Sequence, residues 1–451
     1  MKKVVSLFLA IFFIFSFSNI ITVNASYNSE LDAMADIVLL MSLDDGSIIF
    51  DKNADKITAP ASLTKITTAI LTLEHCKNLD EMVTVKKYCI TELNGTGSSM
   101  AGLLPDEQIS VRNLLYCMLV HSANEAANIL ADYVAGSIDA FIPMMNDLSV
   151  RLGCTNTQYV NAHGLDAEGH YSTAKDLAII TKYALSLPNF LEICSTVRYV
   201  VPATNKSPAR NIVTTNQMQN PSFKGYYCDY IQGIKTGTTD NAGKCVISKA
   251  SKDGYNYLAI VMGAPYIDIN NDTFIDNVAF VDCKKMLDWT FKNIKLKKIA
   301  DPTQIAKVSS VKRAWGVDHI RLVPEKEVSA LVPVGTNENS VQMQIIEAET
   351  PSVVKAPIKK GDILGKAKIL YAETEIATIN LVAAEDIKVS GILLVFDFLK
   401  NVFSSLIFQI LAGVTVLLLL IYLSIIIRHN NKKKRRRKKV RVVKDFRDIN
   451  R

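Results

Sequence analysis

The distribution of apolar residues separates two long uninterrupted runs, one near each end of the chain, from a mixed middle part. The first run extends from Val4 to Ile21, and the second, from Val402 to Ile427, contains no charged residue. At about 26 residues the second run is long enough to span a bilayer with some tilt. It is apolar on all sides rather than along one stripe, so it predicts a transmembrane helix over residues 402–427.

The part of the chain between these runs shows two kinds of periodicity. Apolar residues three or four positions apart predict helices, and shorter apolar or alternating segments predict strands. The expected helices cover residues 61–76, 111–135, 139–152, 173–186 and 276–293. The expected strands cover residues 36–42, 47–50, 244–250 and 256–263. This mixture predicts an α/β domain over residues 30–295, in which helices pack on an antiparallel sheet.

Residues 300–390 have a different character. The alternating segment Val341-Gln342-Met343-Gln344-Ile345 and the turn Lys360-Gly361-Asp362 indicate short strands. We expect a small β-sandwich domain here, which would act as a spacer between the first domain and the membrane; a role in substrate binding is the alternative.

The amino-terminal segment, residues 1–25, has the organisation of a secretory signal peptide. Lys2 and Lys3 precede the apolar run, and Val23-Asn24-Ala25 follows it with small residues suited to cleavage after Ala25. Because the apolar run is long, retention as an uncleaved anchor is the alternative. Either reading predicts that the domains after this segment are exported.

The basic character of the chain comes from its carboxyl-terminal segment. Residues 428–451 contain 13 Lys or Arg and 2 Asp, a net charge of +11, whereas the whole chain carries +7. The rest of the chain, residues 1–427, therefore carries a net charge of −4. A basic segment directly after a transmembrane run is typical of the cytoplasmic side. We expect a cytoplasmic tail that contacts anionic lipid, and no nucleic-acid partner.

Three short motifs suggest the chemistry. They are Ser62-Leu63-Thr64-Lys65, Ser122-Ala123-Asn124 and Lys235-Thr236-Gly237. The first pattern alone is weak, since Ser172/Lys175, Ser309/Lys312 and Ser352/Lys355 repeat it. The order of all three motifs, together with the wide gaps between their leading residues, makes the combination specific.

A serine hydroxyl needs a neighbouring base to become a nucleophile. Positions i and i+3 share one face of a helix, so Lys65 is placed to accept the proton of Ser62. Lysine acts as a base only when neutral, and burial or a nearby cation lowers its pKa. Lys235 is the candidate for that second cation. Ser122 is the candidate relay that protonates a leaving amine, and Asn124 a donor to the substrate amide.

The sequence around these motifs resembles that of the D-alanyl-D-alanine carboxypeptidases, the low-molecular-mass penicillin-binding proteins. The matching segments are Ala59–Lys65, Gly97–Met100, Leu114–Tyr116, His121–Ala127, His163–Ala174 and Gly233–Thr239. The resemblance is strong over residues 30–295 and looser over 300–390. It implies a serine β-lactamase/transpeptidase-like fold and a serine-type enzyme that removes the terminal D-alanine from peptidoglycan stem peptides and is acylated by β-lactams.

The same resemblance implies further roles at the site. The backbone N–H groups of Ser62 and Thr238 would form the oxyanion hole, and the hydroxyls of Thr236 and Thr238 would bind the substrate carboxylate. Gly237, on an edge strand, would let the substrate backbone approach. Ala123 stands where many members carry glycine.

Many relatives also carry an arginine shortly before the Lys-Thr-Gly motif, where it binds the substrate carboxylate. None occurs between Asn211 and Lys235. Arg210 is too far upstream for that role to be assigned to it. Carboxylate binding is therefore expected to depend on Lys235, Thr236 and Thr238.

Two alternative functions stay open at this point. A serine β-lactamase would need a loop glutamate for deacylation, usually followed closely by Leu-Asn, and Glu168 lacks that context. A non-catalytic β-lactam or muropeptide receptor would need an output domain, which the short basic tail does not resemble. A Ser-His-Asp triad would be marked by a G-x-S-x-G segment, and none occurs.

Neither a cofactor nor a metal is expected. The histidines show no metal-ligand spacing, and we read His163 and His170 as parts of a loop. The eight cysteines contain no Cys-x-x-Cys pair, and their pairing cannot be read from spacing. Several lie in apolar surroundings, so we expect mostly free, buried thiols.

Overall fold

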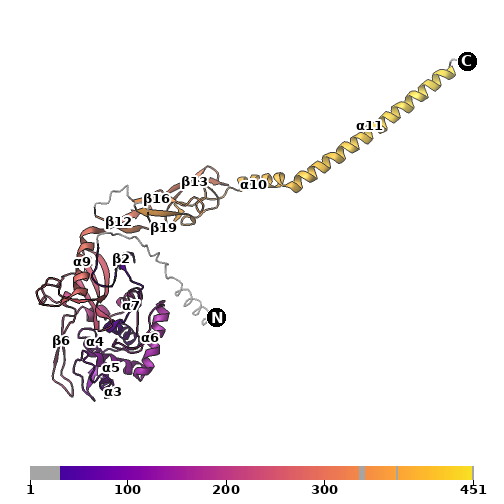
Figure 1. Ribbon diagram of the computed structural model, residues 1–451. Coiled ribbons are helices and arrows are strands. Elements are labelled where there is room, and N and C mark those ends of the chain that lie inside the picture. Colours follow the sequence, from indigo (N-terminus) through magenta and orange to yellow (C-terminus); the bar gives the residue numbers. More distant parts are fainter. Residues whose placement is uncertain (1–30, 335–340, 372–373, 449–451) are drawn as a thin grey trace. The chain divides into compact units, whose positions relative to one another are not determined.

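The computed structural model describes residues 31–334, 341–371 and 374–448. The predicted signal peptide, residues 1–25, lies outside the described residues. The structure divides into a larger unit, which contains residues 31–300, and a second unit rich in strands and helices toward the carboxyl terminus (Figure 1).

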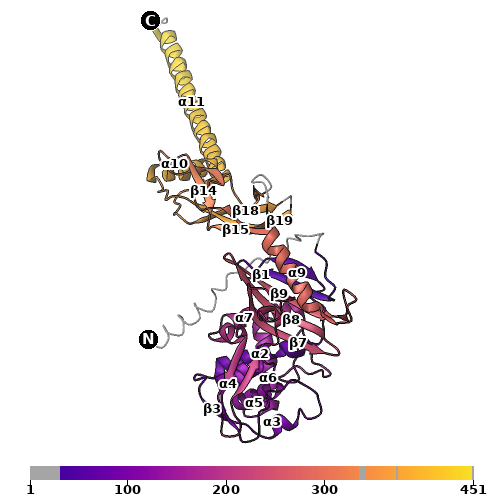
Figure 2. The ribbon, with the colours of Figure 1, turned by 90° about the vertical axis from the view of Figure 1, so that its left-hand side faces the viewer.

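A five-stranded antiparallel sheet forms the centre of the larger unit, with the order β2-β1-β9-β8-β7 (Figure 2). Its strands are β1 (Ile37–Ser42), β2 (Ile48–Lys52), β7 (Ile231–Thr239), β8 (Gly243–Lys252) and β9 (Tyr255–Ala264). The four strands expected from the apolar pattern are present. The Lys-Thr-Gly motif lies in β7, at one edge of the sheet.

Strand β1 shows how the sheet separates two apolar cores. Successive side chains of a strand point to opposite faces. Ile37, Leu39 and Met41 therefore belong to one core, which includes residues of α2, α4, α5 and α7. Val38 and Leu40 belong to the other, which includes residues of α9. Burial of each such side chain contributes about 1.5–3 kcal/mol.

The helices of this unit cover the predicted segments, with two differences described below, and two short helices over residues 88–91 and 190–194 were not predicted. The helices are α2 (Lys65–His75), α3 (Tyr88–Thr91), α4 (Val111–Leu119), α5 (Asn124–Ala135), α6 (Ile138–Leu152), α7 (Ala174–Leu185), α8 (Phe190–Cys194) and α9 (Val278–Asn293). The expected helix 61–76 begins with a 3₁₀ turn, Ala61–Thr64, before α2. The expected single helix 111–135 is wrong, because α4 ends at Leu119 and α5 begins at Asn124.

Small two-stranded antiparallel sheets accompany the main sheet, and the sequence pattern did not predict them. They are β3 (Met82–Thr84) with β4 (Gln108–Ser110), β5 (Arg198–Val201) with β6 (Arg210–Val213), and β10 (Tyr266–Ile267) with β11 (Asp276–Asn277). Each strand has only two to four residues, too short to produce a clear period.

All eight cysteine side chains are buried and none is paired in a disulfide. Burial raises the pKa of Cys117, Cys194 and Cys245 to about 12. These thiols are therefore protonated at neutral pH and act as small apolar residues.

The β-rich character predicted for residues 300–390 is confirmed. A six-stranded sheet has the order β16-β18-β19-β14-β13-β17, and β12 pairs with β15 in a separate two-stranded sheet. The strands are β12 (Ile294–Ala300), β13 (Lys307–Lys312), β14 (His319–Pro324), β15 (Val328–Pro333), β16 (Val341–Ile345), β17 (Val353–Lys355), β18 (Ile363–Tyr371) and β19 (Thr374–Ala383).

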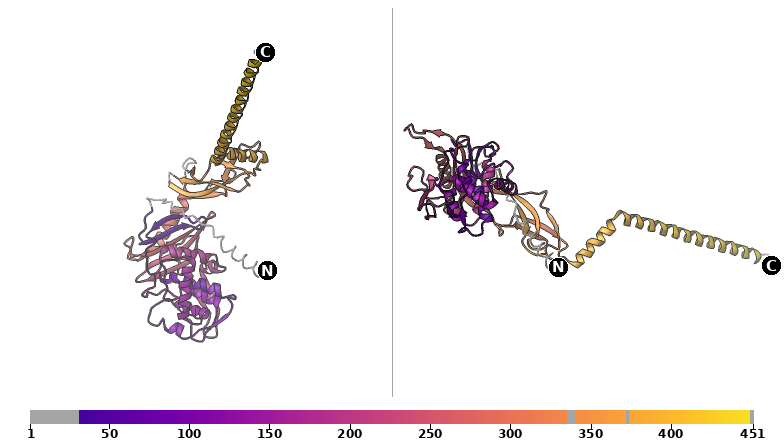
Figure 3. Two further views of the ribbon diagram at one scale, coloured as in Figure 1. Left: turned by 90° about the vertical axis from the view of Figure 1, so that its right-hand side faces the viewer. Right: turned by 90° about the horizontal axis from the view of Figure 1, so that it is seen from below.

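Two helices follow the β-rich part, α10 (Gly391–Ser404) and α11 (Leu406–Asp448), drawn in yellow tones in Figure 3. Among the described residues, one helix is long and apolar enough to cross a membrane, over Leu406–Lys434. The predicted start at Val402 is wrong. Ser405 has an extended backbone that ends α10, and its Oγ accepts a hydrogen bond from Phe408 N at the start of α11.

Candidate active site

The Ser62 side chain lies in a strained turn at the start of α2. Ala61 has a φ of +48°, a left-handed conformation that costs about 1–3 kcal/mol for a residue with a side chain. Ser62 follows in the 3₁₀ turn, and Lys65 begins the α-helix. The expected one-face arrangement results, since Lys65 Nζ lies 2.8 Å from Ser62 Oγ.

Lys65 is fully buried, which is rare for a lysine. Its Nζ also donates to the carbonyl oxygen of His163 at 2.5 Å, so the 163–170 loop fixes the position of the amine. Burial, and then the charge of Lys235, hold the pKa of Lys65 well below its usual 10.5, although Glu125 opposes this. A larger share of Lys65 is therefore neutral at a given pH.

The break between α4 and α5 presents Ser122 to the same site. Ser122 has a φ of +66°, which no residue within a regular helix adopts. Lys235 Nζ donates to Ser122 Oγ at 2.8 Å, and burial lowers the pKa of Lys235 to about 7. Asn124, the first residue of α5, is buried, and its backbone N–H donates to Ser99 O at 2.9 Å.

Two threonine hydroxyls of the Lys-Thr-Gly-Thr segment in β7 make hydrogen bonds within the protein. The Thr236 hydroxyl is 2.5 Å from the hydroxyl of Thr215, and Thr238 Oγ1 donates to Gly237 O at 2.8 Å. Thr215 N donates to Val120 O at 3.1 Å, which fixes the loop beside the α4–α5 break. The sequence analysis did not single out Thr215, because its contact with Thr236 crosses 21 residues.

Arg210 has other partners. Its guanidinium donates two hydrogen bonds of 2.7 Å to the buried Glu107 carboxylate and one of 3.1 Å to Gly102 O. This pair joins the β5–β6 hairpin to the loop 99–107. The geometry therefore gives Arg210 a structural role in holding the hairpin to this loop.

Gly237 allows β7 to approach the turn that contains Ser62 closely. A Cβ atom at this position would lie 2.9 Å from Ala61 Cβ and 3.2 Å from Ser62 N. Both distances are shorter than ordinary van der Waals contacts, and the second involves a backbone atom. The motif's glycine is thus required by the enzyme's own packing, in addition to any approach by substrate.

Gly237→Ala is expected to lower the acylation rate of Ser62 by about tenfold or more, because the added Cβ displaces the Ser62 turn. The overpacking should also cost about 1–3 kcal/mol of stability. Gly225→Ala is the matched control, since its Cβ would meet nothing within 4 Å. Acylation kinetics and thermal unfolding of both variants test this. Unchanged acylation in Gly237→Ala would contradict the close-packing account.

Glu125 is a buried acid beside the site that sequence reasoning missed. Its Oε1 accepts a hydrogen bond from Ala101 N at 2.7 Å, which ties the loop 99–103 to the start of α5 next to Asn124. Burial raises the pKa of Glu125 above its usual value. In the sequence, the indication that Glu125 belongs to the site was its position directly after the Ser-Ala-Asn motif.

The two loop histidines support the nucleophile turn. His163 holds Lys65 through its backbone oxygen, and His170 Nε2 lies 2.8 Å from Thr64 Oγ1. Burial lowers the pKa of His163 to about 3 and that of His170 to about 4. Both rings are therefore neutral at physiological pH, so the loop positions the turn, through the His163 backbone oxygen and the His170 ring, without adding charge.

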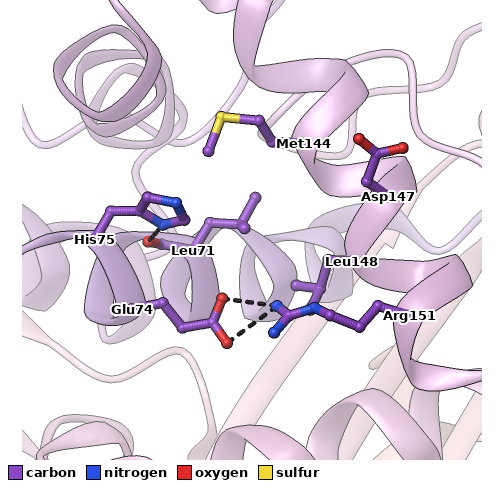
Figure 4. A pocket seen from close by; sticks show the side chains of 7 residues that line it. All are labelled: Leu71, Glu74, His75, Met144, Asp147, Leu148 and Arg151. Carbon is purple, nitrogen blue, oxygen red and sulfur yellow. Dashed lines mark hydrogen bonds and ion pairs between the residues drawn. The ribbon is translucent and has the colours of Figure 1, made fainter. Parts of the chain in front are cut away.

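A separate groove of about 470 Å³ lies between the carboxyl-terminal end of α2 and α6 (Figure 4). Glu74 of α2 and Arg151 of α6 face each other there and form an ion pair at 2.8 Å. Glu74 lies nine residues beyond Lys65, or about 14 Å along the helix. The groove is therefore separate from the site around Ser62 and Lys65. In the described part of the chain, no three metal-binding side chains cluster.

The comparisons with known proteins agree with this geometry. Residues 23–266 match the model of the D-alanyl-D-alanine carboxypeptidase family (Peptidase S11), and residues 292–389 match the penicillin-binding protein 5 C-terminal domain. D-alanyl-D-alanine carboxypeptidase DacC of Escherichia coli (strain K12) is 30% identical over 362 residues, 78% of this chain and 84% of that protein. D-alanyl-D-alanine carboxypeptidase DacF of Bacillus subtilis (strain 168) is 30% identical over 375 residues, which cover 83% of this chain and 90% of that protein.

A solved structure of a penicillin-binding protein has a similar fold. The crystal structure of penicillin-binding protein 5 from Haemophilus influenzae superposes with a TM-score of 0.64 at 26% identity, covering 80% of this chain and 99% of that one. This family implies peptide substrates and β-lactam binding. With Ser62, Lys65, Ser122 and Lys235 gathered at one site of this fold, the chain belongs to the D-alanyl-D-alanine carboxypeptidases of the low-molecular-mass penicillin-binding proteins and is a serine-type enzyme of that family.

Proposed function

We propose that the enzyme removes the terminal D-alanine from peptidoglycan stem peptides through an acyl-enzyme on Ser62. The observation that carries this proposal is the pair of contacts from two buried lysines to two serines, Lys65 to Ser62 and Lys235 to Ser122, each at 2.8 Å. In the first pair, Lys65 is the base for the nucleophile Ser62. In the second pair, Lys235 is the proton donor to the hydroxyl of Ser122.

In the acylation step, neutral Lys65 takes the proton of Ser62 as Oγ attacks the carbonyl carbon of the penultimate D-alanine. The carbonyl oxygen gains negative charge between the backbone N–H groups of Ser62 and Thr238. The C–N bond then breaks, and the leaving D-alanine amine takes a proton through Ser122. Attack by water on the ester releases the shortened peptide and restores Ser62.

Substrate binding uses the edge of β7 and the start of α5. Asn124 donates to the substrate amide, and the substrate carboxylate binds among Lys235, Thr236 and Thr238, with Gly237 allowing the peptide backbone to lie close to the strand. The partial positive charge of Lys235, whose pKa is near 7, supports anion binding there. All of these steps use side chains and backbone groups of the chain itself.

β-Lactams should form the same ester. We expect benzylpenicillin to add its full mass to the detergent-solubilised protein, and peptide mapping to find the adduct on the peptide that contains Ser62. The Ser62→Ala variant should stay unmodified, whereas Ser352→Ala, which changes an exposed serine of another Ser-x-x-Lys segment, should be modified normally. An adduct on any other residue would contradict the assignment of the nucleophile.

The membrane arrangement is part of the proposal. The long apolar helix supports membrane anchoring, and we propose that it crosses the cell membrane once. The catalytic domain over 30–295 and the β-rich domain over 300–390 would then be extracytoplasmic, because the basic residues 428–451 favour the cytoplasmic side. This division into domains, with a signal peptide over 1–25, is the one that the sequence analysis predicts.

A further inference from the structure

The hairpin loop between β13 and β14 carries a large exposed aromatic residue. Trp315 is 74% exposed, and Val317, two residues later, is 40% exposed. An exposed tryptophan of this kind is uncommon on a soluble surface and is typical of membrane–water interfaces, where the ring is apolar and its N–H polar. The catalytic site described above does not involve this loop.

The same loop is attached to α10 by three polar contacts. Arg313 Nε and Nη2 lie 2.7 Å and 2.5 Å from an oxygen of the Asp397 carboxylate. Ser390, the residue before α10, donates its backbone N–H to Arg313 O at 2.7 Å. These contacts hold the loop that contains Trp315 close to the first half of α10.

Helix α10 has one apolar face that the described protein leaves uncovered. Ile392, Phe396 and Phe403 are 62%, 65% and 56% exposed, and their spacing places them on one side. Asp397 lies on the opposite side, where it meets Arg313. The contact with the loop thus turns the apolar face of α10 away from the β-rich domain.

The neighbouring helix determines what covers that face. Only Ser405 separates α10 from α11, the helix with the candidate membrane span. The rings of Phe403 and Phe408 are in contact, with centroids 4.8 Å apart. With α11 spanning the membrane as proposed above, α10 directly precedes the point where the chain enters the bilayer, and lipid is the medium nearest to its apolar face.

We propose that the β13–β14 loop, residues 313–318, is a second membrane contact, in which Trp315 inserts at the headgroup boundary of the lipid surface that α11 enters. The proposal rests on the membrane-spanning arrangement proposed above. Exposed Lys312 and Lys355, paired in register at the ends of β13 and β17, lie at the same end of the sheet and suit anionic headgroups. The loop and α10 would together fix the β-rich domain to the membrane surface.

The chain contains only two tryptophans, Trp289 and Trp315, which makes the test direct. Trp289 lies in α9 and packs against the core of the catalytic domain. The full chain is reconstituted into phosphatidylcholine–phosphatidylglycerol vesicles, with or without lipids brominated near the top of the acyl chains, since bromine quenches nearby tryptophan. Trp289→Phe leaves Trp315 as the reporter, and Trp315→Phe leaves Trp289.

We expect brominated vesicles to remove most of the emission of Trp289→Phe and little of the emission of Trp315→Phe. Equal quenching of both variants, or none in Trp289→Phe, would overturn the proposal. Co-flotation and resistance to alkaline extraction are measured on the same samples. Full vesicle association with an unquenched Trp315 would overturn this contact alone, whereas loss of association would contradict the membrane-spanning arrangement and this contact with it.

Discussion

The Lys65→Met variant is expected to acylate Ser62 about 10²- to 10⁴-fold more slowly than the native enzyme, the range that a positioned general base contributes. Lys65 Nζ is the group 2.8 Å from Ser62 Oγ, so its removal leaves the hydroxyl without its base. Methionine keeps the length and the apolar stem of the side chain. The buried site should therefore stay filled, and the loss should appear in the chemistry rather than in folding.

Lys175→Met is the matched control. It makes the same substitution in another Ser-x-x-Lys segment, where the lysine is partly exposed and pairs with Asp55. Stopped-flow acylation by a chromogenic cephalosporin measures both variants, and thermal unfolding shows that both fold. Native-like acylation in Lys65→Met would remove Lys65 from the proposed mechanism.

The dependence on pH gives a second readout of the same prediction. The acylation rate should rise as Lys65 loses its proton, and burial together with Lys235 places its pKa well below 10.5. The acylation rate of the native enzyme should therefore reach its maximum at a lower pH than it would with a lysine of ordinary pKa. In Lys65→Met this rise should disappear. A native profile that rises only near 10.5 would contradict the lowered pKa.

The contact between Ser62 and Lys65 was predictable because the first motif encodes local geometry. Ser62 and Lys65 are three positions apart on one helical turn, so their contact follows from spacing alone. The meeting of Ser122 with Lys235 crosses 113 residues, and no spacing rule gives it. It was expected only from the resemblance of the three motifs, in order, to a known family.

The sequence could not predict the break between α4 and α5. The stretch from Leu114 to Val120 is continuously apolar, and a helix over 111–135 fits that pattern. Ala123 and Ser122 are not helix breakers, yet Ser122 adopts a φ of +66°. The conformation is held by tertiary contacts with Lys235 and with the loop at Ser99, which a local pattern does not contain.

The division of the carboxyl-terminal apolar run was missed for a similar reason. Hydropathy averages over Ser405 and treats residues 402–427 as one segment. In the structure, Ser405 ends one helix and caps the next, so that α10 and α11 are separate. The contact of Asp397 in α10 with Arg313 was not predictable either, because the two residues lie 84 positions apart in the sequence.

The Ser62→Ala variant should lose D-alanine release almost completely, by a factor on the order of 10⁴ to 10⁶, because the substitution removes the atom that forms the acyl-enzyme. It deletes one oxygen from a half-buried side chain, so the fold and the position of Lys65 should be kept. Binding of substrate without turnover is the expected remaining activity.

The central claim is tested most directly by measuring D-alanine release from a pentapeptide that ends in D-Ala-D-Ala, with the native full chain, Ser62→Ala and the control Ser352→Ala. Release by the native chain and by Ser352→Ala, and none by a folded Ser62→Ala, is the predicted result. Release by Ser62→Ala at the native rate, or its absence from the folded native chain, would contradict a carboxypeptidase that acts through Ser62.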